Sequence, residues 1–195
     1  MSDKESPIIL ASSSPRRADL LRTVGVDFEV APSPVQERPH AGEAPADYIT
    51  RLARAKVIGI ARQRERGLVI GADTIVVLDG KILGKPADEA EATRMLRSLA
   101  GRWHAVMTGV ALYEVASKQE VADYDKTLVR FCQLSEQEIA WYVKSGEPMD
   151  KAGAYGIQGL AALFVEEVAG NYFNVVGLPL PLVYRLARRL GYSFI

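Results

Sequence analysis

The chain has 195 residues, of which 48% are hydrophobic and 25% are charged, a composition typical of one soluble globular domain with a sizeable core. Lys and Arg together number 24, as do Asp and Glu, so no overall positive field is present to attract duplex nucleic acid or an anionic membrane. A basic site must therefore be local, and a small anion is a better expected partner than a nucleic-acid polymer.

Targeting signals and soft metal ligands are both scarce in the sequence. The polar start MSDKES is followed by an apolar run too short for a signal sequence, and no segment approaches the length of a membrane span. We therefore expect a cytoplasmic protein. A single cysteine, Cys132, rules out an internal disulfide, and with only His40 and His104 in addition there is no zinc-type cluster. A metal would be bound by oxygen, which indicates Mg²⁺ or Mn²⁺.

The first candidate site lies in residues 8–21, with the sequence IILASSSPRRADLL. The apolar run predicts a short strand, and Ser14 before Pro15 predicts the start of a helix. The N–H groups and the positive dipole at such a start can bind an anion. Arg16 and Arg17 are unfavourable there unless an anion is bound. The stretch predicts a phosphate site, although a capped helix with two solvated arginines would have the same pattern.

The next segments contain an acid in a loop and a lysine on an apolar helix face. A strand over 26–31 leads into a proline-containing loop with Glu37, for which a solvated surface role is the simpler interpretation. The spacing of apolar residues predicts an amphipathic helix over 46–64. Lys56 falls on its apolar face, so the ammonium either has an anionic partner or reaches water along an apolar surface.

A near-continuous apolar run over 68–78 predicts a strand buried on both faces of a sheet. Asp73 stands in its middle, where a carboxylate is unexpected, and we interpret it as catalytic or metal-binding rather than structural. Gly71 suggests close approach by another group. A tight turn at Asp79 and Gly80 then leads into a short strand and a second isolated lysine, Lys85.

Regular elements follow, interrupted by one glycine-rich stretch. Capping patterns predict helices over 88–99 and 135–146, with two strands between them, and further elements are expected as a strand over 160–168 and a helix over 179–190. Between Asp150 and Gly159 glycine recurs every third residue, as required where backbone approaches a ligand or another chain closely. Gln158 could read the edge of a base there. His104 and Cys132 are interpreted as structural.

The order of elements predicts an α/β fold, because strands and helices alternate first and antiparallel strands follow. We expect one domain over residues 1–195, built around a mixed β-sheet flanked by helices. In such sheets phosphates bind where strands meet helix N-termini.

Six short motifs, taken together, resemble the Maf family of nucleoside triphosphate pyrophosphatases. They are ASSSPRR, RLARAK, GADT, GKP, DKAGAYGIQG and NVVGLP, in this order and over nearly the whole chain. The resemblance implies two lobes around a deep cleft, similar to inosine triphosphate pyrophosphatases. It also implies hydrolysis of a nucleoside triphosphate to the monophosphate and pyrophosphate, with dTTP and UTP as substrates. Such an enzyme would serve nucleotide-pool housekeeping, including modified pyrimidine nucleotides.

The resemblance also implies roles for individual residues. Asp73 is the expected proton acceptor, and Arg16, Thr74 and Gln158 are the positions expected to discriminate the base. The expected phosphate-binding residues are Ser12, Ser14, Arg17, Lys56 and Lys85. A divalent metal cation, Mg²⁺ or Mn²⁺, would be held by Glu37 and Asp73. The position before Glu37 is usually acidic in the family and is Gln36 here, which leaves the metal site one carboxylate short.

Two alternative functions are considered. One is a nucleotide-binding regulator of septum formation, which would need the phosphate site but not Asp73. The other is a 7-methyl-GTP pyrophosphatase, a subgroup with a different first motif, GSDQ instead of GADT and no YGIQG. Nucleic acid and membrane are not expected partners, and a homodimer is left open.

Overall fold

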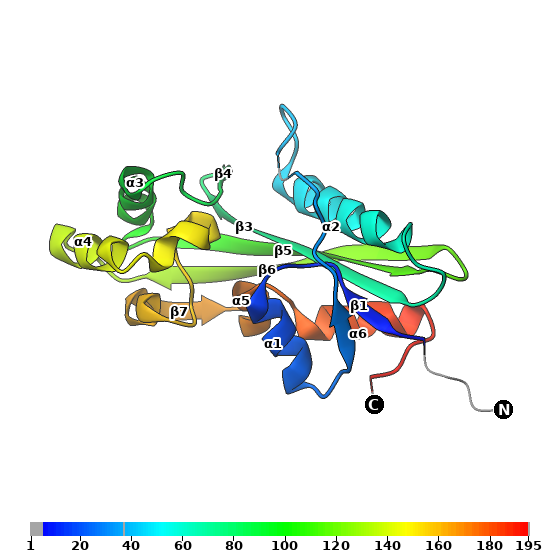
Figure 1. The fold of residues 1–195 in the computed structure, drawn as a ribbon. Helices are drawn as coiled ribbons and strands as arrows, with labels where there is room; N and C mark the ends of the chain where they lie inside the picture. The colour runs from blue at the N-terminus through cyan, green and yellow to red at the C-terminus, as the bar shows by residue number, and fades with distance from the viewer. Residues whose placement is uncertain (1–5, 37, 195) are drawn as a thin grey trace. The chain divides into compact units, whose positions relative to one another are not determined.

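The computed structural model describes residues 6–36 and 38–194, which form a mixed sheet with helices (Figure 1). The strands are β1 (Ile8–Leu10), β2 (Phe28–Val30), β3 (Leu68–Leu78), β4 (Lys81–Leu83), β5 (Trp103–Glu114), β6 (Gln119–Phe131) and β7 (Val165–Ala169). The α-helices are α1 (Pro15–Thr23), α2 (Pro45–Ala61), α3 (Glu89–Leu99), α4 (Glu136–Lys144), α5 (Tyr172–Val176) and α6 (Leu180–Arg189). Three 3₁₀ segments are η1 (Glu147–Asp150), η2 (Ala152–Ala154) and η3 (Leu160–Phe164).

The described strands form one seven-stranded sheet in the order β2-β1-β3-β5-β6-β7, with β4 also paired to β3. β1 runs parallel to both β2 and β3, whereas β4 is antiparallel to β3 and β7 is antiparallel to β6. The prediction of an α/β fold with a mixed sheet flanked by helices is confirmed. The deep cleft between two lobes stays a prediction.

The chain divides into two compact units, and the first comprises the described residues of Met1–Asp73, Thr108–Asp125 and Gly177–Ile195. Its core includes apolar side chains of β1 and β3 packed with those of α2, among them Ile9, Val69 and Val57. Glycines let α2 approach the sheet closely. A Cβ on Gly109 would lie 2.5 Å from the carbonyl oxygen of Ile49, too close for any side chain.

The second unit comprises Thr74–Met107 and Lys126–Val176. In its core, the buried faces of α3 and α4 pack with residues of β3, β5 and β6 and with η3. Phe131 makes edge contacts with His104, Tyr155 and Phe164 at ring-centroid separations of 5.1, 4.7 and 6.3 Å. Such aromatic pairs add to the stability gained from burial.

Several local predictions are confirmed, and one is wrong in part. Ser135 and Glu138 form the complete capping box of α4, and β3 has the predicted limits. The strand predicted over 160–168 begins only at Val165, because residues 160–164 form η3. In that segment Ala161 and Phe164 are buried, three residues apart, which is a helical rather than an alternating period. α5 was not predicted, and no described helix has the length and apolar character needed to cross a membrane.

Candidate active site

The turn between β1 and α1 follows a strand that lies directly beside the strand of Asp73. Leu10 is opposite Ile70 in the parallel pair, and the Ala11 N–H donates to the Ile70 carbonyl at 2.7 Å. Parallel neighbours present their carboxyl ends at the same edge of a sheet, where ligands of α/β proteins commonly bind. The register therefore brings the candidate phosphate turn and the central region of β3 to one part of the first unit.

The turn is held in shape by its own side chains. The Ser12 hydroxyl accepts from the Ser14 N–H at 3.2 Å and from the Arg17 guanidinium at 3.0 Å. The Nε of Arg17 donates to the Gly177 carbonyl at 2.8 Å, so the guanidinium is anchored by the NVVGLP motif. Sequence reasoning missed this role of Gly177, because the two residues are 160 positions apart.

One expectation for this turn needs correction. Ser14 occupies the N-cap position of α1, but its side chain makes no capping hydrogen bond within the part of the chain that the structure describes. The guanidinium of Arg17 has acceptors from Ser12 and Gly177 within the protein, and whether it also binds an anion stays a prediction. Binding of phosphate by Ser12, Ser14 and Arg17 stays a prediction.

Asp73 and Lys56 form a buried ion pair in the first unit. Each residue is only 6% exposed, and the Lys56 Nζ lies 2.5 Å from Oδ1 of Asp73. The ammonium also lies 3.4 Å from the Ala72 carbonyl oxygen, a long contact. The sequence left open whether Lys56 has an anionic partner or extends to water, and the structure gives it Asp73 as a partner.

Gly71 explains how α2 comes close enough for this pair to form. A Cβ at this position would lie 2.7 Å from a methyl carbon of Val57 and 2.9 Å from the Ala53 carbonyl oxygen. The close approach predicted for Gly71 therefore exists, but α2 makes it rather than a ligand. A larger residue would move the helix that carries Lys56 away from Asp73.

Of the remaining candidates, three belong to the second unit, Arg16 belongs to the first, and Glu37 lies outside the described residues. Thr74 follows Asp73 in β3 and is partly buried, Lys85 is exposed between β4 and α3, and Gln158 is exposed between η2 and η3. Arg16 lies in the first turn of α1 and is partly buried. Convergence of Arg16, Thr74 and Gln158 on one base stays a prediction, and Glu37 lies outside the described residues.

Glycines of the loop before η3 are approached by their own chain. A Cβ on Gly153, which has a φ of +68°, would lie 2.7 Å from Val76. The same distance separates such an atom on Gly156 from the Lys151 side chain. These contacts explain why residues 153 and 156 are glycines. The sequence pattern instead predicted a close approach by a ligand or another chain.

His104 has the structural role that the sequence predicted. It is 3% exposed, and its Nε2 lies 2.7 Å from the Tyr155 hydroxyl. Burial lowers the pKa of His104 to about 4, so the ring is neutral at pH 7. Cys132 is partly buried and packs against the core of the second unit, where burial raises the pKa of its thiol.

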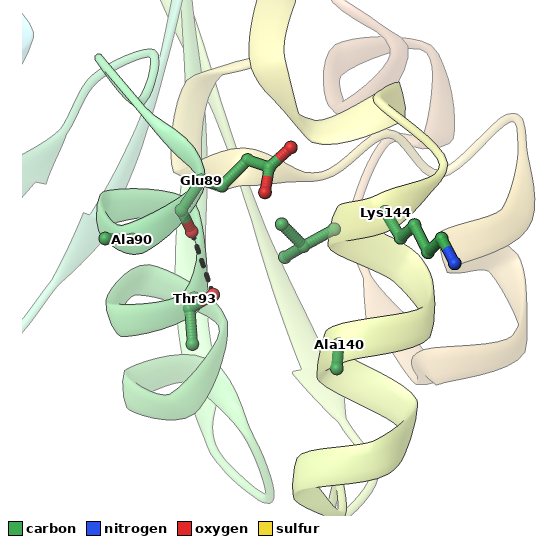
Figure 2. Close-up of a pocket in the computed structure, with 6 residues that line it drawn as sticks. Glu89, Ala90, Thr93, Ala140 and Lys144 are labelled. Atoms are coloured by element: carbon green, nitrogen blue, oxygen red, sulfur yellow. Dashed lines mark hydrogen bonds between the residues drawn. The ribbon is translucent and has the colours of Figure 1, made fainter.

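Two further features bear on where a ligand can bind. Across residues 6–36 and 38–194, no three side chains of His, Cys, Asp or Glu come together as a metal-binding group. A hollow of about 550 Å³ lies between α3 and α4, lined by Glu89, Ala90, Thr93, Ala140, Val143 and Lys144 (Figure 2). None of the candidate site residues lines it.

Comparisons with known proteins identify the family. The model of the Maf-like protein family matches residues 7–190. The chain is 51% identical to the dTTP/UTP pyrophosphatase of Symbiobacterium thermophilum, covering 95% of this chain and 94% of that protein. It is 52% identical to the dTTP/UTP pyrophosphatase of Geobacter sulfurreducens, covering 94% and 96%.

A solved structure, that of the Staphylococcus aureus Ham1 protein, is 15% identical and covers 65% of this chain and 72% of its own, with a TM-score of 0.48. The family match and the two relatives each extend over nearly the whole length of the chain. The chain therefore belongs to the Maf family.

Proposed function

We propose that this chain is a hydrolase that cleaves dTTP and UTP between the α and β phosphates, giving the monophosphate and pyrophosphate. The relatives named dTTP/UTP pyrophosphatase, about half identical over more than nine-tenths of both chains, support this substrate class. We further propose one catalytic domain over residues 1–195, because β3 and β5 contribute residues to both units. Its proposed location is the cytoplasm, and its proposed task is the housekeeping of normal and modified pyrimidine nucleotides.

The observation that carries the proposal is the buried carboxylate of Asp73, held by Lys56 at 2.5 Å. A protein that only bound a nucleotide would gain nothing from it, because a carboxylate repels phosphate and is costly to bury. An enzyme can use it to orient the attacking water and to accept its proton. Lys56 fixes the orientation of the carboxylate by binding one of its two oxygens.

The phosphate groups would be bound by the turn between β1 and α1 and by the lysines. In phosphoryl transfer the charge spreads over the phosphate oxygens, so fixed positive groups stabilise the transition state. The hydroxyls of Ser12 and Ser14, the guanidinium of Arg17 and the ammonium groups of Lys56 and Lys85 are the proposed groups. The hydrogen bond from the Arg17 guanidinium to the Ser12 hydroxyl would keep the turn in shape before substrate arrives.

A divalent cation fits the donor set, since the proposed ligands are the carboxylates of Asp73 and Glu37. Mg²⁺ is commonly bound by one or two carboxylates together with substrate phosphates, rather than by a closed protein cage. Bound there, Mg²⁺ or Mn²⁺ would neutralise charge on the phosphates.

Base selection is assigned to Arg16, Thr74 and Gln158. A glutamine amide can pair with the O4 acceptor and the N3–H donor of uracil or thymine, whereas cytosine presents the reverse pattern. A site whose polar groups fit one base rejects its mismatch, because those groups are otherwise left unpaired.

A nucleotide panel with Mg²⁺ tests the proposal. We expect dTTP and UTP to be cleaved in preference to CTP, ATP and 7-methyl-GTP, with release of pyrophosphate, and with loss of activity in chelator. Asp73→Asn is the matched negative control. Release of orthophosphate with a nucleoside diphosphate, or full activity in chelator, would contradict the mechanism.

A further inference from the structure

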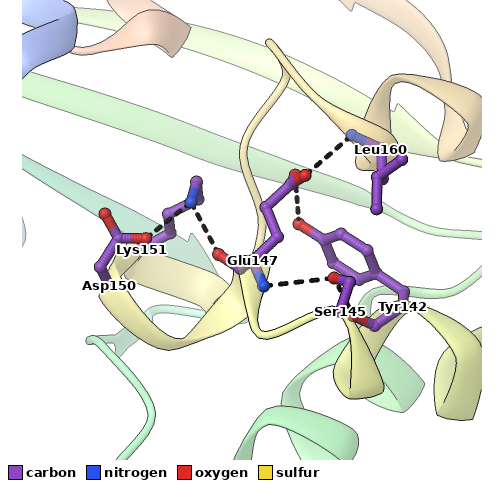
Figure 3. A network of polar contacts seen from close by, with 6 residues as sticks. All are labelled: Tyr142, Ser145, Glu147, Asp150, Lys151 and Leu160. Atoms are coloured by element: carbon purple, nitrogen blue, oxygen red, sulfur yellow. Dashed lines mark hydrogen bonds and ion pairs between the residues drawn. The ribbon is translucent and has the colours of Figure 1, made fainter.

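The backbone just after Gln158 is hydrogen-bonded to the side chain of Glu147 (Figure 3). The Leu160 N–H donates to Oε2 of Glu147 at 3.0 Å. The Tyr142 hydroxyl donates to the other carboxylate oxygen, Oε1, at 3.0 Å. We call this arrangement the Tyr142–Glu147 clamp; it holds the backbone two residues after Gln158.

Gly159 leaves room for the carboxylate of Glu147, because it has no side chain. A Cβ on Gly159 would lie 2.6 and 2.7 Å from the two carboxylate oxygens of Glu147, so the carboxylate occupies the space where a side chain would be. The carboxylate therefore lies directly against the backbone of the residue that follows Gln158. Only glycine allows this contact, and the loop cannot shift at this point without losing it.

The clamp is itself fixed by the core of the second unit. Tyr142 is fully buried on α4, and its ring contacts Phe164 edge-on at 5.4 Å. The Ser145 hydroxyl accepts from the Glu147 N–H at 3.2 Å, and the Lys151 Nζ donates to the Glu147 carbonyl at 2.6 Å. Burial and the hydrogen bond to Glu147 raise the pKa of Tyr142, so its hydroxyl remains a donor at neutral pH.

We propose that Glu147 and Tyr142 are positioning residues that set the place of Gln158 and so contribute to the choice of uracil or thymine over cytosine. This inference rests on the proposed function, in which Gln158 reads the base. An amide distinguishes the two patterns only if its oxygen and nitrogen reach fixed places, and a misplacement of about 1 Å can cost 100-fold in rate. Gln158 is exposed, so its place is fixed only if buried residues such as Tyr142 hold the neighbouring backbone.

Four single variants test the proposal through the ratio of kcat/KM for UTP to that for CTP. Glu147→Gln offers one oxygen where the carboxylate uses two, and Tyr142→Phe removes only the hydroxyl. We expect either change to lower the ratio about tenfold, the effect of one lost hydrogen bond, through KM for UTP with little change in kcat. Glu136→Gln is the matched control. Glu136 lies on α4, as Tyr142 does, but pairs with Arg97, so the change should leave the ratio unchanged.

Gln158→Ala separates the two levels of the argument. If it leaves the ratio unchanged, the proposed base reading is wrong and the clamp has nothing to position. If it lowers the ratio while both Glu147→Gln and Tyr142→Phe retain the wild-type value, the positioning role is wrong and the base reading stands.

Hydrogen exchange of residues 152–164 gives a second measurement, made on the intact protein without nucleotide. Faster exchange of this segment in the clamp variants, with the rest of the chain unchanged, is the expected result. Wild-type exchange in both variants would overturn the proposal. Should Glu147→Gln fail to fold, Tyr142→Phe carries the same test.

Discussion

The buried ion pair between Lys56 and Asp73 allows catalysis and stability to be tested with one set of variants. Asp73→Asn keeps the volume of the side chain but leaves a lysine that is 6% exposed without its carboxylate. Removing one partner of a buried ion pair costs about 3–5 kcal/mol. For a chain of this length we expect a melting temperature about 6–20 °C lower.

The reverse change, Lys56→Met, should cost a similar amount, because it removes the ammonium that lies 2.5 Å from the buried carboxylate. The double variant removes both charges, and replacing a whole buried pair with neutral groups is often close to neutral. We therefore expect the double variant to be more stable than either single variant. The coupling energy between the two positions should be at least about 3 kcal/mol.

Urea unfolding and turnover of UTP, measured on all three variants, check this reasoning. Asp73→Asn and the double variant should both lose activity, since loss of a positioned base typically costs about 10² to 10⁴ in rate. An Asp73→Asn variant that is folded but inactive would support the catalytic role of the carboxylate. Additive effects of the two changes, or a double variant with near wild-type turnover, would refute the argument.

The remaining predictions concern pH, packing and the base. Burial lowers the pKa of His104 to about 4, so the unfolded chain takes up a proton first as the pH falls below 6.5. Stability should therefore drop by about 2 kcal/mol between pH 7.5 and pH 5, and urea unfolding of His104→Gln should show a flatter profile. Gly71→Ala would place its Cβ 2.7 Å from Val57 and should lower the free energy of unfolding by about 1–3 kcal/mol, as thermal unfolding would show. A Cβ at Gly84 would have no atom within 4 Å, so Gly84→Ala should melt like wild type. Gln158→Glu should lower the preference for dTTP and UTP over CTP, and kcat/KM values that rank a purine nucleotide first would contradict the base assignment.

The sequence by itself determined the elements whose pattern is local. The apolar run of β3 has the predicted limits, because a strand buried on both faces needs only apolar residues in succession. The capping box of α4 and the hairpin turn at Asp79 and Gly80 depend on residues a few positions apart. Asp73 was identified as a candidate for the same reason, since a carboxylate inside an apolar strand is visible without any partner.

Only the tertiary structure decided which groups meet. Lys56 and Asp73 are 17 residues apart, and their pairing depends on how closely α2 approaches β3, which the sequence does not state. Gly71 and Gly159 predict a close approach from the sequence, but only the structure shows that α2 lies against the first and the Glu147 carboxylate against the second. Periodicity reports which face of an element is apolar, whereas contacts between elements depend on packing of the whole chain. The proposed function depends on those contacts, because the Asp73 carboxylate and the Gln158 amide can act on a substrate only if neighbouring residues fix their positions.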